Sequence, residues 1–221
     1  MRSDTMSPRQ AQLVEAAMRI IATKGSRRFT AQLLADEVGV TPGAIYRHFP
    51  SLNAIVDAVV DRVGALLFAD VPPDARDPIP RLGAFFRCRC RAILANPALS
   101  RLLLSDHLAQ AAGGAQAKRL EGFRRRSRDF VAGCLREAAA RGQLAAGIEP
   151  DAGAVIVLGS ILALCHSGTR IVDAEGFERL AEAVWAALER ALRRRAPAVR
   201  RPMAAPARVG RGGSTVRGGT R

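Results

Sequence analysis

Residues 29–51 place the strongest constraint on the fold, because their spacing predicts two short helices joined by a tight turn. Thr30 can cap the first helix, and Gly39 can end it in a left-handed backbone conformation. Thr41 and Pro42 can then begin the second helix, since a hydroxyl suits the N-cap and proline suits the first helical position. A helix, a turn and a helix are therefore expected here.

The second of these helices is predicted to have a buried side and a small exposed side. Ile45 and Phe49 are four residues apart, so both are expected to point inward. The opposite side is left to Thr41, Pro42, Gly43, Tyr46 and Arg47. A short helix with such a face fits the major groove of duplex DNA. Arg47 could read a guanine through paired donors or neutralise a phosphate.

One further helix is expected on each side of this pair. A Ser-Pro pair at residues 7–8 begins the first, whose apolar residues recur at helical spacing until Gly25 ends it. Ser51 caps a longer and very apolar helix. We therefore expect a three-helix DNA-binding domain in residues 1–50 and a linking helix in residues 51–69.

The rest of the chain is predicted to be helical as well. Residues 70–80, DVPPDARDPIP, carry four prolines and three aspartates and are interpreted as a non-helical boundary. No strand alternation follows, so the fold class predicted is all-α, with a helical ligand-binding and dimerisation domain in residues 81–195. The five helices expected in it are Arg81–Ala95, Pro97–Ala112, Ala115–Arg141, Pro150–His166 and Asp173–Arg195.

The last two of these helices predict a contact between two copies of the chain. Gly159 and Ala163 allow close approach of helices, and the final helix carries an apolar stripe of Leu180, Val184, Leu188 and Ala191. Two such helices from each chain could form a four-helix interface, although a monomeric core would use the same residues. We favour the homodimer, because helix-turn-helix proteins usually bind two half-sites.

The charge of the chain favours an anionic partner. Its 34 Lys and Arg residues exceed its 20 Asp and Glu residues, giving a formal net charge of +14. Such a chain is drawn to nucleic acid or to an anionic membrane, and charge alone does not choose between them. Residues 196–221 hold six arginines and no acid among Pro, Gly and Ala, so we expect a disordered basic tail that adds non-specific phosphate affinity.

Enzymes and metal proteins receive little support from the sequence. We find no phosphate-binding loop, no nucleophile motif and no cluster of metal-ligating residues, so no catalytic residue, metal or cofactor is predicted. The cysteines have no zinc-ligand spacing and are interpreted as reduced cytosolic residues: Cys88, Cys90, Cys134 and Cys165.

A membrane location is also disfavoured. The first ten residues, MRSDTMSPRQ, contain no apolar signal segment. The 18 residues that follow Asp151 without Asp, Glu, Lys or Arg include glycine, serine and histidine, so a buried interface helix is favoured over a membrane span. The Arg-rich residues 124–128 are interpreted as a solvated helix face.

Residues 38–51, VGVTPGAIYRHFPS, resemble the TetR/AcrR family of bacterial transcriptional regulators. The resemblance covers about Ser7 to Val63, and residues 46–51 are also similar to the nucleoid-occlusion branch of that family. It implies a cytoplasmic, nucleoid-associated DNA-binding regulator, most simply a ligand-responsive repressor that binds a palindromic operator as a homodimer. The alternative it implies is an architectural protein of cell-division control that acts through a protein partner.

The resemblance also implies roles for particular residues. Those expected on or beside the DNA are Thr30, Gln32, Thr41, Pro42, Gly43, Tyr46, Arg47 and His48. Tyr46 and His48 would reach phosphates, although His48 could instead pack against the next helix. Family members usually carry lysine where this chain has Leu52, so one phosphate contact is missing, and Arg27 or Arg28 could replace it.

In this family a small molecule bound by the C-terminal helices releases the operator. The residues that could line such a cavity are Phe85, Phe86, Cys90, Leu103, His107, Phe123 and Phe130, and ordinary core packing is the alternative for each. His107 beside Asp106 could simply be a surface pair. Because the chain has one Trp and one Tyr, an apolar or acyl effector is favoured over a flat cationic one.

Overall fold

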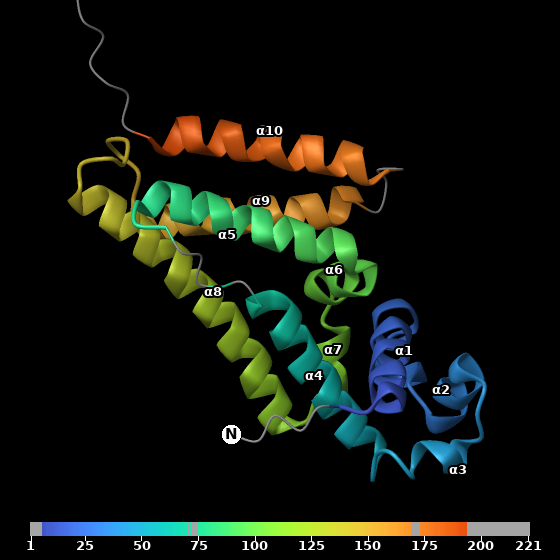
Figure 1. Cartoon of the computed structure of the whole chain (residues 1–221). Helices are drawn as coiled ribbons and strands as arrows, with labels where there is room; N and C mark the ends of the chain where they lie inside the picture. The colour runs from blue at the N-terminus through green and yellow to red at the C-terminus, as the bar shows by residue number, and fades with distance from the viewer. Residues whose placement is uncertain (1–5, 70, 72–74, 169–172, 194–221) are drawn as a thin grey trace, which may run out of the picture.

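The computed structural model describes residues 6–69, 71, 75–168 and 173–193, and it confirms the all-α prediction. In these residues the β-type pairing is limited to an isolated bridge between Leu144 and Arg193. The predicted basic tail, residues 196–221, lies outside the described residues. Figure 1 shows a helix-turn-helix end, formed by α1, α2 and α3, and a layered helical end.

The described helices follow the predicted order with two differences: a short 3-10 helix η1 (Ser26–Arg28) follows the first helix, and the helix predicted over Pro97–Ala112 is divided in two. The α-helices are α1 (Pro8–Lys24), α2 (Ala31–Val38), α3 (Pro42–Ile45), α4 (Leu52–Phe68), α5 (Pro78–Ala95), α6 (Pro97–Leu104), α7 (His107–Ala111), α8 (Gly114–Ala140), α9 (Pro150–Gly168) and α10 (Ala174–Leu192).

The predicted caps of the N-terminal helices are confirmed. The Ser7 hydroxyl accepts from the backbone N–H of Gln10, and the Gln10 side chain accepts from the backbone N–H of Ser7, which closes a capping box. Gly25 ends α1 with a φ of 80°. Thr30 and Ser51 cap α2 and α4 through their hydroxyl oxygens.

Several helix ends differ from the prediction, most by one or two residues and the start of α5 by three. Helix α5 begins at Pro78 rather than Arg81, because Asp77 caps it by accepting from the backbone N–H of Ile79. Prolines are tolerated there, since the N–H groups of a first turn have no acceptor within the helix. Helix α10 ends at Leu192, and the predicted end at Arg195 lies outside the described residues.

The prediction of one helix from Pro97 to Ala112 is wrong. Ser105 has an extended backbone, with φ −123° and ψ 159°, and Asp106 has φ −89° and ψ 9°, so the chain divides into α6 and α7. The break lets α7 turn toward η1 and α1, which it contacts.

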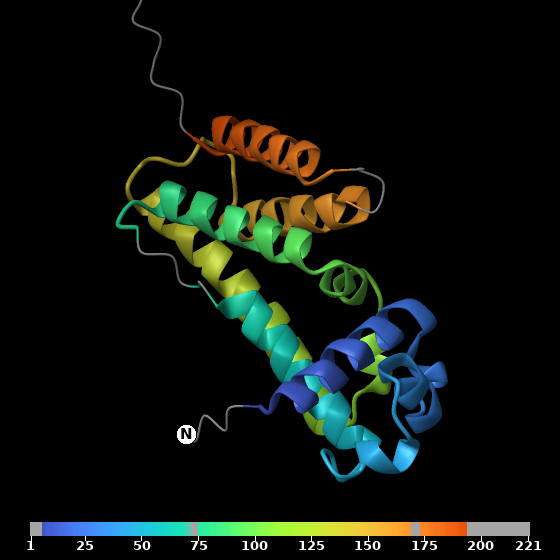
Figure 2. The ribbon, with the colours of Figure 1, turned by 45° about the vertical axis from the view of Figure 1, so that its right-hand side comes forward.

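Two apolar clusters form the described core. The first cluster contains residues of α1, α2, α3, α4, α6 and α7, and the second contains residues of α5, α8, α9 and α10. Leu103 of α6 packs against both clusters. In Figures 1 and 2, α5, α9 and α10 lie in layers at one end, while α8 runs from that end along α4. The core of the helix-turn-helix unit is therefore continued by helices of the predicted effector domain.

Candidate DNA-binding surface and effector domain

The turn between α2 and α3 has the predicted geometry. Gly39 adopts the left-handed conformation, with φ 71° and ψ 45°, and the Thr41 hydroxyl caps α3. The second helix was expected to include Phe49, but α3 ends at Ile45. The chain then turns, and the N–H groups of His48 and Phe49 both donate to the carbonyl of Ile45, over 2.9 and 3.0 Å. Phe49 precedes a proline, and this position disfavours helical backbone.

The inward and outward sides of this unit are as predicted. Ile45 is fully buried and Phe49 is 8% exposed, whereas Tyr46 is 48% exposed. Of the other residues expected to face DNA, Pro42 and His48 are partly buried. The remaining ones are exposed: Thr30, Gln32, Thr41, Gly43 and Arg47. Contact of these residues with DNA stays a prediction.

Gln10 fixes the position of this surface relative to α1. Its side-chain amide nitrogen, Nε2, donates to the backbone carbonyl of His48 over 3.2 Å. At Gly43, a Cβ atom would meet nothing within 4 Å. The fold itself therefore makes no steric demand for glycine at that position, and open space remains for the backbone of a partner to approach.

The charges beside this surface are mostly basic. Arg27 and Arg28 are exposed on η1, immediately before the start of α2. The Gln32 side-chain amide donates to the Asp36 carboxylate over 2.8 Å, so one acidic side chain of α2 already has a hydrogen-bond partner within the helix. Leu52, where family members usually carry lysine, is half-buried at the first turn of α4.

The residues predicted to line an effector cavity are not brought together at one place. Phe86 packs against Trp185 of α10, with ring centroids 5.5 Å apart, and Phe85 packs against Phe130 of α8 at 5.0 Å. Phe123 faces α4, where its ring lies 5.8 Å from that of Phe68. These contacts belong to both apolar clusters, so most of the predicted residues serve core packing.

For His107 the structure agrees with the core-packing alternative rather than with a surface pair to Asp106. Its ring lies against the end of α1, where a Cβ atom on Gly25 would be 3.7 Å from Nε2. The Nδ1 atom is buried and has no hydrogen-bond partner. Asp106 instead has a carboxylate oxygen 3.7 Å from a guanidinium nitrogen of Arg124. His107 therefore belongs to the contact between α7 and α1.

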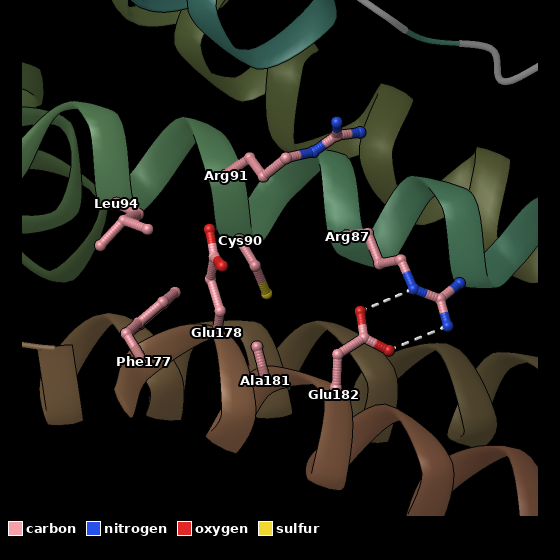
Figure 3. A pocket seen from close by; sticks show the side chains of 8 residues that line it. All are labelled: Arg87, Cys90, Arg91, Leu94, Phe177, Glu178, Ala181 and Glu182. Atoms are coloured by element: carbon pink, nitrogen blue, oxygen red, sulfur yellow. Dashed lines mark hydrogen bonds and ion pairs between the residues drawn. The ribbon is translucent and has the colours of Figure 1, made fainter. Parts of the chain in front are cut away.

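A cleft of about 330 Å³ lies between α5 and α10 (Figure 3). Two hydrogen bonds of 2.7 and 3.0 Å join Arg87 to Glu182 across it. Of the predicted effector residues, Cys90 lines the cleft; the other lining residues are Arg91, Leu94, Phe177, Glu178 and Ala181. Burial raises the pKa of the Cys90 thiol to about 12, so the thiol is neutral near pH 7 and has little nucleophilic character.

One side of α9 exposes a run of apolar residues. Val155 is 66% exposed, Ile156 57% and Leu162 42%, and Gly159 and Ala163 lie exposed between and beside them. On α10, Leu180 is 37% exposed, while Val184 and Leu188 are half-buried against the second cluster. Exposed apolar faces of this kind mark interaction surfaces.

The described residues lack two other kinds of feature. No helix in them combines the length and apolar character needed to cross a bilayer. Within the same residues, no three His, Cys, Asp or Glu side chains are grouped so that they could hold a metal ion.

Comparison with known proteins places these features in a family. Residues 13–59 match the bacterial regulatory proteins of the tetR family. A nucleoid occlusion factor SlmA of Alteromonas mediterranea is 30% identical over 108 residues, which cover 45% of this chain and 53% of that protein. The chain spans about half the length of the first curated relatives it matches.

The fold of most of the chain is shared with solved regulators. The ketosteroid transcriptional regulator KstR2 of Mycobacterium tuberculosis superposes with a TM-score of 0.73 at 19% identity, covering 86% of this chain and 97% of that one. AibR, solved with isovaleryl coenzyme A and operator DNA, has a TM-score of 0.66 at 18% identity, covering 81% and 97%. Residues 13–59 thus form a TetR-family helix-turn-helix domain, and most of the chain shares its fold with solved regulators of the TetR/AcrR type.

Proposed function

We propose that this protein is a cytoplasmic, ligand-responsive repressor that binds a palindromic operator at the nucleoid as a homodimer. The observation that carries this proposal is the exposed turn from Thr41 to Arg47, which is capped, anchored to α1 by Gln10 and surrounded by basic residues. A short, rigidly held element of this kind fits the major groove. We assign the protein no catalytic activity.

The apolar face of α9 supports the homodimer. Val155, Ile156 and Leu162 would be covered by the same face of a second copy, as in an isologous interface. The small residues Gly159 and Ala163 on this face would let the two helices approach closely. Pairing through this end would present two helix-turn-helix units to one duplex.

An acyl effector is supported by the solved neighbours. AibR was solved with isovaleryl coenzyme A, and FadR of Bacillus subtilis, at 15% identity and a TM-score of 0.62, with stearoyl-CoA. The predicted preference for an apolar or acyl molecule agrees with both. In this chain the effector would act within the C-terminal helices, where α4 connects them to the DNA-binding unit.

Selection of duplexes from a random DNA pool tests the proposal. The chain should be used in full and also shortened after residue 195, so that the Arg-rich tail does not dominate binding. We expect both forms to enrich one palindrome whose half-sites lie about one or two helical turns apart. If the shortened chain binds all duplexes equally, the proposal fails.

Nucleoid occlusion is the second candidate, because the 30% identical relative is a nucleoid occlusion factor. Such a protein would bind DNA at many places and act on a protein partner. Mapping of the bound chromosome separates the two: a few promoter sites, especially beside its own gene, support the repressor, and many dispersed sites support the second role.

A further inference from the structure

Arg89 of α5 is a buried cation without an anionic partner in the described structure. Its side chain points away from the cleft, toward α4 and α8, and the residue is 4% exposed. The Nη1 atom is buried and makes no hydrogen bond. Guanidinium groups of buried arginines are normally paired, because leaving water without a compensating anion is costly.

Aromatic rings and one hydroxyl surround the guanidinium of Arg89. Its Cζ lies 4.7 Å from the ring centroid of Phe68 and 4.8 Å from that of Phe85, so aromatic rings cover the guanidinium. Nη2 donates to the Ser127 hydroxyl over 3.0 Å, and that hydroxyl donates to the carbonyl of Phe123. Nη1 is therefore a buried donor group that these contacts leave unused.

A second cation lies beside this group. The Cζ of Arg126, an exposed residue of α8, is 4.1 Å from the ring centroid of Phe68. Burial is the main cause that lowers the pKa of Arg89 to about 10, and the charge of Arg126 lowers it further, yet Arg89 remains charged near pH 7. Among the described residues, the ion pairs include neither Arg89 nor Arg126. Arg89 and Arg126 thus both lie against Phe68, and neither forms an ion pair with a carboxylate of the described residues.

We propose that Arg89, with Arg126, binds the anionic group of an apolar effector between α4, α5 and α8. The guanidinium donates from Nη1 to a carboxylate or phosphate oxygen, in the charge-assisted geometry that arginine favours. The apolar part of the effector would enter by displacing phenylalanine rings that pack against one another at this junction. The inference deepens the proposed function, since it rests on an effector-responsive protein and names the chemistry of the effector.

The place of this site would couple it to DNA binding. Phe68 is the last residue of α4, whose other end packs in the helix-turn-helix core. It is half-buried, and the guanidinium groups of Arg89 and Arg126 both lie against its ring, so we expect an anion that joins the two cations to displace this ring. Movement of Phe68 would shift the end of α4.

Calorimetric titration of the full chain without DNA tests the site, with octanoate, octyl phosphate and the uncharged octanamide as probes. We expect at least one anion to bind about tenfold or more tightly than octanamide, as charge-assisted hydrogen bonds imply. The better anion identifies carboxylate or phosphate as the preferred group. The Arg89→Met variant should lose the preference, and Arg125→Met, which removes an exposed neighbour of Arg126, should keep it.

Thermal unfolding without ligand gives a second readout. A purely structural arginine would make Arg89→Met less stable, whereas an uncompensated charge predicts equal or higher stability. If Arg89→Met does not fold, Arg89→Lys keeps a charge without the planar fork and should still weaken anion binding.

Three results would overturn the inference. One is equal binding of octanoate, octyl phosphate and octanamide by the natural chain, and another is an undiminished anion preference in Arg89→Met. The third is a stability coupling between Arg89→Met and Asp70→Asn or Asp74→Asn, acids outside the described residues, because it would show an internal partner. Selection of a DNA sequence is measured separately, so failure of the anion site leaves the repressor proposal standing, and the reverse also holds.

Discussion

Gly64 of α4 lies directly under the ring of Phe123 of α8, so that a Cβ atom on Gly64 would be 2.6 Å from Cζ of that ring. The two helices approach more closely here than any residue with a side chain would permit. Gly83 of α5 stands in the same relation to the indole of Trp185 on α10, at 2.7 Å. Two helix contacts of this fold therefore depend on a missing side chain.

Substitution Gly64→Ala is expected to lower the free energy of unfolding by about 1–3 kcal/mol, the usual cost of overpacking a core. The measurement is denaturant unfolding followed by circular dichroism. Gly122→Ala on α8 is the matched control, because a Cβ atom there meets nothing within 4 Å. Alanine has the higher helix propensity, so the control should gain up to about 1 kcal/mol. A Gly64→Ala protein as stable as the control would contradict the close contact.

Arg47→Ala is expected to weaken operator binding without affecting the fold, because Arg47 is exposed. If Arg47 reads guanine, the loss should be about 1–3 kcal/mol and confined to one base position. If it meets a phosphate, all duplexes should weaken alike, and the salt dependence of binding should fall. Fluorescence anisotropy with the operator and its single-base variants measures both. Unchanged binding on every duplex would remove Arg47 from the interface.

Val155→Glu on α9 is expected to dissociate the homodimer, since it would bury a carboxylate in an apolar interface. Sedimentation velocity should show a monomer at concentrations where the natural chain is a dimer. Ala139→Glu, which adds the same charge at an exposed position of α8, should remain a dimer. A dimeric Val155→Glu protein would place the interface elsewhere.

Alkaline pH is expected to destabilise the protein through its buried thiols. Burial raises the pKa of Cys90 to about 12 and that of Cys165 to about 11, against an ordinary value of 9.0. The thiols therefore lose their protons at lower pH in the unfolded chain than in the folded one. The stability that this difference removes is fully present below pH 9 and should fall as the pH rises above 9. Between pH 9 and 10 we expect a loss of roughly 1 kcal/mol per thiol, before deprotonation of Arg89 acts in the opposite direction. Cys90→Ala should reduce the dependence of the free energy of unfolding on pH in this range, measured by chemical unfolding at each pH.

The sequence predicted the parts of the fold that depend on local chemistry. Hydroxyl caps, Gly39 in its left-handed turn and the inward pair of Ile45 and Phe49 are short-range features, and each is present in the structure. The start of α5 was misjudged because three of its first-turn neighbours are proline or aspartate, which suit a first turn as well as a loop.

The effector residues could not be predicted in the same way. His107 and Phe123 are ordinary members of amphipathic helices, and only the packing of α7 on α1 and of α8 on α4 decides where they point. Arg89 was missed because a lone arginine in a helix looks like a surface residue. Its burial follows from contacts with Phe68 and Ser127, which are distant in sequence.

The hydrogen bond from Gln10 ends on the main chain of His48, and it is indifferent to which side chain residue 48 carries. The segment from Thr41 to His48 is therefore held through its backbone, and a segment of equal length with other side chains could replace it. A panel of such grafts on this scaffold should yield proteins of altered operator preference that retain the same thermal tolerance.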